Sequence, residues 1–340
     1  MVIRTIDAHC GGAPLRLIVE GFPSPRGATM REKDQWAARH ADATRQALML
    51  EPRGHGAMCG ALFTEPVSPA AHAGILFLVT GGSAPILGHG IIAAATIALE
   101  RGLIMPGGDG TSLTFDTVAG TIAVRVQRSP RAGGGDRVSS VSFSAIPSFV
   151  VLPGVPVAVG PRQLRVDVAY GGAFYAIVDS ESAGLPLDTA HFPELGRAGV
   201  DIRTAIEARH DITHPSDAVP GGIEATIFTA PPRDARADLR GVAVFANGQV
   251  DRSASGTGMW AIMAVLDAMG LLADDRPFVQ ESAIGTNFSA RAIRRTMVAD
   301  YPAIVAETEG TAWITGEHTF VLEEADPFRD GFAVEPGTAS

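Results

Sequence analysis

The sequence predicts an α/β protein made of two similar halves, and three observations lead to this prediction. Strand-like and helix-like segments alternate along the chain, separated by many glycine and proline residues. The length of 340 residues is enough for about two domains. An apolar helical segment with glycines at both of its ends occurs twice, once early and once late in the chain.

The expected elements follow from the spacing of apolar residues. The uninterrupted apolar run at 73–79 predicts a buried strand, and the pattern at 31–50 predicts a helix. The alternation in 111–144, with a turn at 131–136, predicts a β meander. We further expect strands at 1–6, 15–19, 166–178, 225–229, 242–245 and 319–324, and helices at 91–101, 194–210 and 259–269.

The stretch 146–161 is rich in proline, valine and glycine, and we interpret it as the crossover between the halves. We therefore expect a first half at 1–148 and a second half at 149–311. The segment 312–340 is expected to return to the first half.

Composition excludes several functions. The formal net charge of −10 argues against nucleic acid and anionic membranes as partners, because both attract a basic face. The one lysine, Lys33, lies in a polar run that we interpret as solvated, which argues against imine chemistry on a buried lysine. The two cysteines, Cys10 and Cys59, form no CxxC pair, so a cysteine zinc site is not expected.

The N-terminal residues contain no long apolar core typical of a signal peptide. The longest apolar stretch, 258–272, carries Asp267 and is too short to cross a bilayer. We therefore expect a cytoplasmic protein, and a homodimer is compatible with the sequence.

The internal repeat aligns residues 87–104 with residues 255–272 at a constant offset. Each copy follows a strand and a short turn, and each reads as Gly-x-Gly, an apolar helix and a closing C-cap glycine. The aligned pairs are Gly88 with Gly256, Gly90 with Gly258, Gly102 with Gly270, and Leu103 with Leu271.

A Gly-x-Gly at a helix start leaves backbone N–H groups directed at an anion, with the positive end of the helix dipole behind them. If two such starts met across a cleft, they would hold one small carboxylic acid from two sides. The residue before each Gly-x-Gly would then be placed for acid–base chemistry at the carbon next to the carboxylate. A P-loop is not supported because no GK[ST] follows, and a Rossmann fingerprint is not supported because Ala93 and Ala261 occupy the third glycine position.

Several further motifs accompany the repeat. They are Asp7-Ala-His9, Gly11-Gly12, Pro14-Leu-Arg16, Glu51-Pro-Arg-Gly-His55, Gly88-His89-Gly90, Tyr170-Gly-Gly-Ala-Phe-Tyr-Ala176, Asp251-Arg-Ser253 and Gly256-Thr-Gly258. On these residues the sequence resembles the proline racemase family, which includes proline racemase, 4-hydroxyproline epimerase and trans-3-hydroxy-L-proline dehydratase. The resemblance implies two pseudo-symmetric α/β halves, each a curved sheet around a central helix as in diaminopimelate epimerase. It also implies a small imino-acid ligand held between the two helix starts, without cofactor or metal.

Within the family, three stretches resemble the dehydratase branch most. They are 170–176, 245–253 and the run from His214 to Asp217.

The sequence departs from the family pattern at both catalytic positions. The family has cysteine or serine before Gly-His-Gly, where this chain has Leu87. Before Gly-Thr-Gly it has cysteine in racemases and epimerases and threonine in dehydratases, where this chain has Ser255. A racemase that uses two bases needs a proton-carrying group on each face of the α-carbon, and leucine cannot supply one.

The resemblance implies a role for each remaining site residue. Ser255 and His89 are the candidates to carry protons, and the backbone amides of Gly88, His89, Gly90, Gly256 and Thr257 are the candidates to hold the carboxylate. Asp251 would accept a hydrogen bond from the ring ammonium. The alternatives are helix capping for the glycines, Thr257 and His89, and turn stabilisation for Asp251.

Other residues keep two interpretations. Cys10 and Cys59 are interpreted as small buried residues, with a displaced nucleophile at Cys10 as the alternative. His55 is interpreted as structural. Arg53 is either a carboxylate partner or a solvated or interface arginine.

Three functions follow from these residues. The first is dehydration of trans-3-hydroxy-L-proline to pyrroline-2-carboxylate without a cofactor. The second is epimerisation or racemisation of proline or 4-hydroxyproline. The third is binding of an imino acid without catalysis, because of Leu87 and Ser255.

Overall fold

The protein divides into two units, which we call the first and second halves. The first half comprises Met1–Ser139 and Thr311–Ser340, and the second half comprises Ser140–Gly310. The computed structural model describes residues 1–107, 110–131, 133–144, 146–216 and 221–333. Asp217 of the motif that begins at His214, and residues 334–340 of the returning segment, lie outside the described residues.

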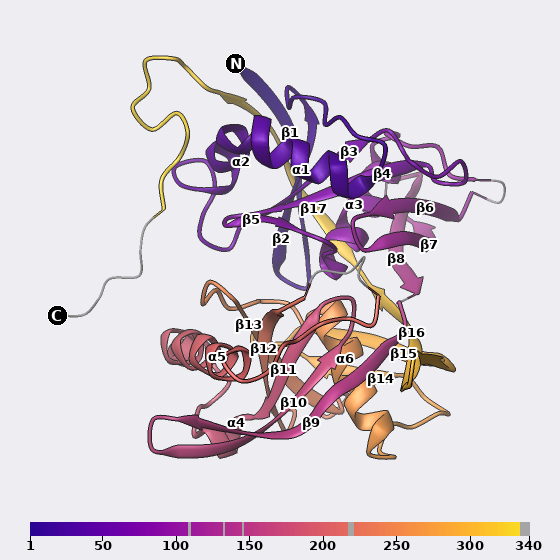
Figure 1. The fold of residues 1–340 in the computed structure, drawn as a ribbon. Helices are drawn as coiled ribbons and strands as arrows, with labels where there is room; N and C mark the ends of the chain where they lie inside the picture. The colour runs from indigo at the N-terminus through magenta and orange to yellow at the C-terminus, as the bar shows by residue number, and fades with distance from the viewer. Residues whose placement is uncertain (108–109, 132, 145, 217–220, 334–340) are drawn as a thin grey trace. The chain divides into compact units, whose positions relative to one another are not determined.

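The first half is a mixed sheet with three helices (Figure 1). Its strands pair in the order β17-β1-β2-β3-β4-β6-β7, and the short β5 adds to β4. The elements are β1 (Val2–Cys10), β2 (Ala13–Glu20), α1 (Met30–His40), α2 (Asp42–Met49), β3 (Cys59–Thr64), β4 (Ala73–Val79), β5 (Gly82–Ala84), α3 (Gly88–Glu100), β6 (Ser112–Thr117), β7 (Gly120–Pro130) and β17 (Ala312–Val321), with β8 (Asp136–Ser144) running into the second half.

The second half is a closed sheet. Its strands pair from β9 to β16 in chain order, and β16 pairs with β9 to complete the ring. The elements are β9 (Ser148–Val159), β10 (Arg162–Tyr170), β11 (Phe174–Asp179), α4 (Ser180–Ala183), η1 (Thr189–His191), α5 (Phe192–Glu207), β12 (Ile223–Ala230), β13 (Leu239–Phe245), α6 (Gly256–Ala268), β14 (Phe278–Glu281), β15 (Asn287–Val298) and β16 (Tyr301–Gly310).

The two halves repeat one topology. The order β17-β1-β2-β3-β4-β6-β7 matches β9-β10-β11-β12-β13-β14-β15, and each successive pair has the same direction in both series. Each of the parallel pairs named in these orders, β2–β3 and β4–β6 in the first half and β11–β12 and β13–β14 in the second, encloses a helical connection, as crossovers between parallel strands require. The predicted pseudo-symmetric α/β fold is therefore confirmed.

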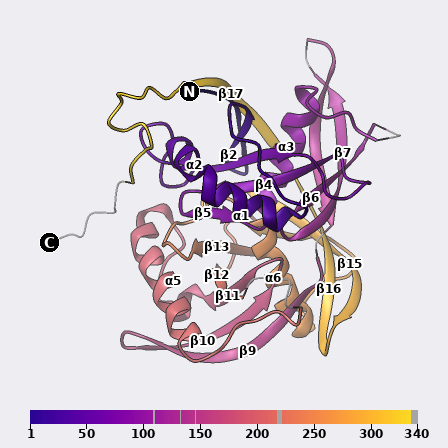
Figure 2. The ribbon, with the colours of Figure 1, turned by 45° about the horizontal axis from the view of Figure 1, so that its top comes forward.

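Each half is built around one buried helix. In the first half α3 contacts β1, β2 and β17, and in the second half α6 contacts β9, β10 and β16. Every residue is buried from Gly88 to Ala98 in α3 and from Gly256 to Val265 in α6. Helices that are apolar on all faces belong inside a protein, and the expected central helices are present. In the second half, α5 instead packs against β9, β12 and β13 (Figure 2).

A glycine turn brings the wall of the second half against its central helix. Gly171 lies between β10 and β11, and a Cβ on it would stand 2.4 Å from the carbonyl oxygen of Thr257 and 2.7 Å from the nitrogen of Ala261. Both of those atoms belong to the α6 backbone, which cannot move aside as a side chain would. The Tyr170–Ala176 motif therefore contains a glycine for close packing.

Two buried carboxylates anchor equivalent loops. Asp116 on β6 accepts the backbone N–H groups of Val67 (2.9 Å) and Ser68 (2.7 Å). Glu281 on β14 accepts those of Arg233 (2.6 Å) and Asp234 (3.0 Å). The loop bound by Asp116 precedes β4, which pairs with β6, and the loop bound by Glu281 precedes β13, which pairs with β14. The repeat between the two halves therefore extends to individual hydrogen bonds.

Four expectations about local structure were wrong. The helix predicted at 31–50 is two helices, because the chain breaks at Ala41 and Asp42 begins α2 with a carboxylate that binds Arg45 (2.6 Å). The crossover predicted at 146–161 is largely strand β9, whose Pro156 lies opposite Arg165, away from the end of the strand that pairs with β16 at Ser148 and Phe149. The strand predicted at 166–178 is two strands, β10 and β11.

The fourth concerns Lys33, which is buried at 5% exposure rather than solvated. Its ammonium group donates a hydrogen bond to the carbonyl oxygen of Glu65. The described helices include none with the length and apolar character needed to cross a membrane.

Candidate active site

The start of helix α3 carries four of the predicted residues. Leu87 is the N-cap residue, in an ordinary extended conformation with φ −127° and ψ 114°. Its carbonyl oxygen accepts the N–H of Ile91 (2.9 Å), but its side chain makes no cap hydrogen bond. The first backbone N–H groups of an α-helix have no intrahelical partners, and the dipole of α3 adds positive potential at the same place.

The side chains around this start are closely packed. Leu87 is 7% exposed and His89 is 4% exposed. A Cβ on Gly90 would lie 2.7 Å from Cε1 of Phe77 on β4 and 3.0 Å from Cβ of Leu87. The second glycine of the motif is therefore needed for packing, and the position before the motif presents an apolar group.

The start of helix α6 differs at the equivalent N-cap. Ser255 has φ 47° and ψ 90°, a conformation that L-residues rarely adopt. Its Oγ accepts the N–H of Gly258 at 3.3 Å. A Cβ on Gly258 would lie 2.7 Å from that Oγ, so glycine at this position leaves room for the cap. Because the hydroxyl accepts in this bond, its own proton remains to be donated elsewhere.

Hydrogen bonds join two of the predicted residues, Asp251 and Ser255, through Ser253. Oδ1 of Asp251 accepts from the backbone N–H (2.9 Å) and the hydroxyl (3.0 Å) of Ser253. The Oγ of Ser253 in turn accepts the N–H of Ser255 at 3.1 Å. All three residues are buried, so the Asp251–Ser253 motif and the helix start form one connected unit.

A tyrosine that sequence reasoning did not assign holds Thr257. The Tyr175 hydroxyl and Oγ1 of Thr257 lie 2.7 Å apart in the interior of the second half. Burial raises the pKa of the Tyr175 phenol, although the bond from Thr257 acts in the opposite direction, so the phenol is neutral at neutral pH. With its hydroxyl occupied, Thr257 has its backbone N–H left to offer a ligand. The signal was the Tyr170–Ala176 motif, which contains this tyrosine.

A second unassigned residue is Gln280 on β14. Its Nε2 donates to the carbonyl oxygen of Ala254 at 2.9 Å, directly before Ser255. It was missed because the four-residue strand that carries it was not predicted.

Several motif residues prove structural. Arg16 is buried and forms an ion pair with Asp7 (2.8 Å). Arg53 is not solvated, because its side chain is 11% exposed and pairs with Asp326 (2.7 Å). His55 accepts the N–H of Ala57 through Nδ1 (3.2 Å), in keeping with its structural interpretation.

Both cysteines are buried, Cys10 at 0% and Cys59 at 6% exposure, which confirms their interpretation as small buried residues. Among the residues that the structure describes, no group of three or more histidine, cysteine or acidic side chains is arranged to hold a metal ion.

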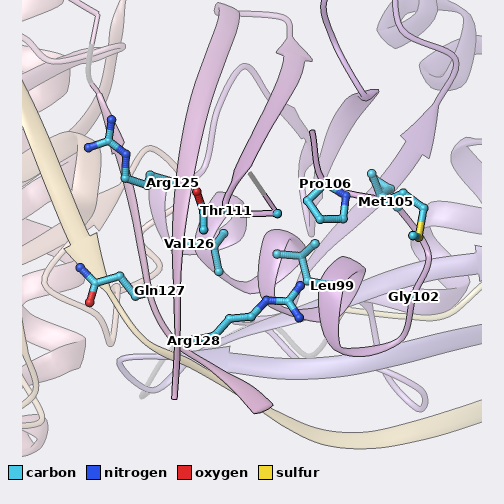
Figure 3. A pocket seen from close by; sticks show the side chains of 11 residues that line it. Leu99, Gly102, Met105, Pro106, Thr111, Arg125, Val126, Gln127 and Arg128 are labelled. Atoms are coloured by element: carbon cyan, nitrogen blue, oxygen red, sulfur yellow. The ribbon is translucent and has the colours of Figure 1, made fainter. Parts of the chain in front are cut away.

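A surface pocket of about 820 Å³ lies elsewhere in the first half, at the far end of α3 (Figure 3). Leu99 and Gly102 line it from the helix end, and Arg125 and Arg128 line it from β7. It contains none of the residues predicted for the site, so the helix starts remain the candidate site.

Comparison with solved structures identifies the class of fold. A probable proline racemase from Agrobacterium radiobacter, solved with bound carbonate, superposes with a TM-score of 0.88 at 29% identity, covering 98% of this chain and 96% of that chain. A hydroxyproline epimerase from Agrobacterium vitis, solved with bound trans-4-hydroxy-L-proline, gives 0.88 at 28% identity, covering 98% and 95%. A predicted epimerase from Pseudomonas aeruginosa shares the fold alone, with a TM-score of 0.58 at 16% identity. The class is therefore the pseudo-symmetric epimerase fold.

The sequence comparisons give the family. The proline racemase family matches residues 5–333. A trans-3-hydroxy-L-proline dehydratase from Bacillus cereus is 38% identical over 331 residues, 97% of this chain and 98% of that protein. A 4-hydroxyproline 2-epimerase from Streptosporangium roseum is 39% identical over 333 residues, covering 97% and 98%. The chain belongs to the proline racemase family.

Proposed function

We propose that the protein dehydrates trans-3-hydroxy-L-proline. The observation that carries the proposal is the difference between the two N-caps: the α6 start has the hydroxyl of Ser255, whereas the α3 start has Leu87. Racemisation by two bases requires a proton-carrying group on each face of the α-carbon. Dehydration of this substrate requires such groups on one face.

The stereochemistry of the substrate explains this requirement. The carboxylate and the hydroxyl are trans on the ring, so the α-hydrogen and the leaving hydroxyl share a face. The C2–H bond breaks and its proton passes to a base, while the C3–O bond breaks and the hydroxide leaves with a proton as water. A C2=C3 double bond forms, and the resulting Δ2-pyrroline-2-carboxylate tautomerises to the imine.

Each site residue has a role in this proposal. The backbone amides of Gly88, His89 and Gly90, and of Gly256 and Thr257, would bind the carboxylate. Asp251 and His89 would hold the ring nitrogen, with Asp251 accepting a hydrogen bond from the ring ammonium, and Ser255 or His89 would relay the protons. A serine hydroxyl is hard to ionise and acts as a base only beside a second base. We propose that no cofactor or metal takes part.

The relatives support both leading candidates. One relative at 38% identity is named trans-3-hydroxy-L-proline dehydratase, and a 3-hydroxyproline 2-epimerase from Burkholderia multivorans is 37% identical. The apolar Leu87 favours the dehydratase over the epimerase, because it leaves one face of the substrate's α-carbon without the proton-carrying group that epimerisation requires. The same residue also favours the third candidate, a protein that binds an imino acid without converting it. We retain the expectations of a cytoplasmic protein with no nucleic-acid or membrane partner, and of a homodimer as one compatible assembly.

Proton NMR in D₂O with the purified protein distinguishes the three functions. The samples contain trans-3-hydroxy-L-proline, trans-4-hydroxy-L-proline or L-proline. Loss of the 3-hydroxyproline signals with growth of pyrroline signals is the expected result. Deuterium at the α-carbon of either other acid, together with its epimer, would replace our proposal with the epimerase. No change in any sample, with saturable binding of pyrrole-2-carboxylate, would replace it with the binding protein.

A further inference from the structure

The peptide group between Ala254 and Ser255 is held at both of its ends by side chains. Its carbonyl oxygen accepts from Nε2 of Gln280 at 2.9 Å, and its N–H donates to Oγ of Ser253 at 3.1 Å. Gln280 and Ser253 are each 1% exposed. Because a peptide group is planar, fixing both ends fixes its rotation, which sets φ of Ser255. This is the residue with the rare φ of 47°.

Gln280 reaches this peptide by crossing a neighbouring strand. A Cβ on Gly241 of β13 would lie 2.5 Å from Nε2 of Gln280 and 3.0 Å from its Cδ, so the amide lies flat over a glycine. Because the carbonyl oxygen of Ala254 needs a hydrogen-bond donor, the side-chain amide of Gln280 is oriented with its nitrogen towards that oxygen. Among the described residues, Oε1 of Gln280 is buried with no hydrogen-bond partner. A buried polar atom left unpaired destabilises the fold, so this glutamine is a poor choice for stability alone.

The first half lacks this arrangement. The first residue of β13, Leu239, pairs with Gln280, and the first residue of β4, Ala73, pairs with Phe115. Phe115 therefore occupies the equivalent place and has no amide to donate. The N-cap of that half, Leu87, has an ordinary φ of −127°. The pair of hydrogen bonds that fixes both ends of the peptide group before the N-cap thus occurs in the half whose N-cap residue is both strained and polar.

We propose that Gln280 and Ser253 are positioning residues that hold the hydroxyl of Ser255 in place for proton transfer. The inference rests on the proposed function, since it assigns a purpose to the Ser255 conformation. A strained backbone persists only where its surroundings enforce it, and these two side chains supply that enforcement. Displacement of a reacting group by about 1 Å costs on the order of 100-fold in rate.

The test compares Gln280→Met, Ser253→Ala and the double variant. Gln280→Met keeps the length of the side chain and removes the donor. We expect each single variant to lower kcat for trans-3-hydroxy-L-proline by about 10- to 100-fold, with KM unchanged in Gln280→Met. Since either change frees the same peptide group, kcat of the double variant should be little lower than kcat of the less active single variant. If the losses of kcat in the two single variants multiply in the double variant, Gln280 and Ser253 do not act on the same peptide group, and the inference is overturned. An unchanged kcat in Gln280→Met would also overturn it.

Gln46→Met is the matched control. The Gln46 amide binds Asp42 within α2 of the first half, and its loss should leave kcat unchanged. A fall in kcat as large as that of Gln280→Met would mean that the effect is general. If Gln280→Met does not fold, Gln280→Glu keeps the shape, replaces the donor by an acceptor and gives the same comparison.

Hydrogen exchange separates this inference from the proposed function. In Gln280→Met, amides of residues 255–259 should exchange faster, while those of α3 keep their rate. An inactive wild-type protein would remove the proposed dehydratase, but the exchange comparison would still test the hold on the peptide. Unchanged exchange at 255–259 would show that Gln280 does not hold it.

Discussion

Leu87 and Ser255 occupy the same N-cap position of two repeated helices, but their backbones differ: φ is −127° for Leu87 and 47° for Ser255. The side chains differ as well, since one is apolar and the other caps its helix through Oγ. The two halves therefore share a topology while their chemistry has become unequal.

Restoring a thiol at the α3 start should increase catalysis. Leu87→Cys, combined with Ser255→Thr, should raise the rate of trans-3-hydroxy-L-proline dehydration by about 10²- to 10⁴-fold, the typical contribution of an acid–base group. A helix start lowers the pKa of a thiol, which makes cysteine a suitable base there. The measurement is the initial rate of substrate loss. Ile86→Cys in the same background places a thiol one residue earlier and is the control; an equal gain in both would contradict a role for position 87.

Ser255→Ala and Ser255→Gly should differ in stability but not in activity. Both remove the hydroxyl and should lower activity by about 10²-fold or more. Alanine keeps the penalty of a positive φ, whereas glycine does not, so the glycine variant should be more stable by about 1–2 kcal/mol. Urea unfolding measures the difference. Equal stabilities would show that the N-cap is not strained, and retained activity would remove Ser255 from the mechanism.

Asp116 should make stability depend on pH on the acid side. Burial opposes ionisation, but hydrogen bonds from Ser68, Thr121 and Val67 outweigh it and hold the pKa of the Asp116 carboxyl below its ordinary value of 3.8. A lowered pKa stabilises the fold above pH 3.8, and this stabilisation is lost as the pH falls through the folded-state pKa. Asp116→Asn should therefore cost about 1.5–3 kcal/mol at pH 7 and progressively less below pH 3.8.

Thermal unfolding from pH 2 to pH 7 checks this expectation, with Asp136→Asn as an exposed control. A difference between wild type and Asp116→Asn that stays constant over this range would contradict it.

Gly171→Ala should destabilise the second half. The added Cβ would meet the carbonyl oxygen of Thr257 and the nitrogen of Ala261, both of the α6 backbone. Overpacking of this kind costs about 1–3 kcal/mol or more. Gly56→Ala, where the new Cβ meets nothing within 4 Å, should change stability by less than about 0.5 kcal/mol. The two variants are compared by their denaturant midpoints. Equal midpoints would mean that the backbone around Gly171 shifts to make room for the added Cβ.

Thiol alkylation should leave activity intact. Cys10 and Cys59 are buried, so iodoacetamide should modify the folded protein slowly and without loss of turnover. Mass spectrometry follows the modification and NMR follows the turnover. Rapid inactivation that accompanies labelling of Cys10 would instead support a displaced nucleophile.

The sequence was most informative where glycines mark helix ends. Gly88, Gly90, Gly256 and Gly258 marked the starts of two similar apolar helices, and the resemblance to the family implied that these helices are central. The residues 251–255 were correctly singled out as a motif. Their hydrogen bonds are local, between residues two apart, so sequence proximity already indicated contact.

Contacts between distant residues were not predictable. Tyr175 meets Thr257, and Gln280 meets Ala254, only after several strands have paired in register. Strand β9 was mistaken for a crossover because its prolines normally interrupt strands, and in the structure Pro156 lies in register opposite Arg165 of β10. Such compensations depend on the neighbouring strand and leave no local pattern.

The pairing of β1 with β17 has a consequence for synthesis on the ribosome. These adjacent strands lie at opposite ends of the described chain, and the whole of the second half is made between them. The second half is one continuous segment whose strands close a ring, so it can fold as soon as it emerges. The part of the first half that is made earlier keeps one edge of β1 unpaired until β17 has been made. The sheet of the first half is therefore completed only after the whole of the second half has been made.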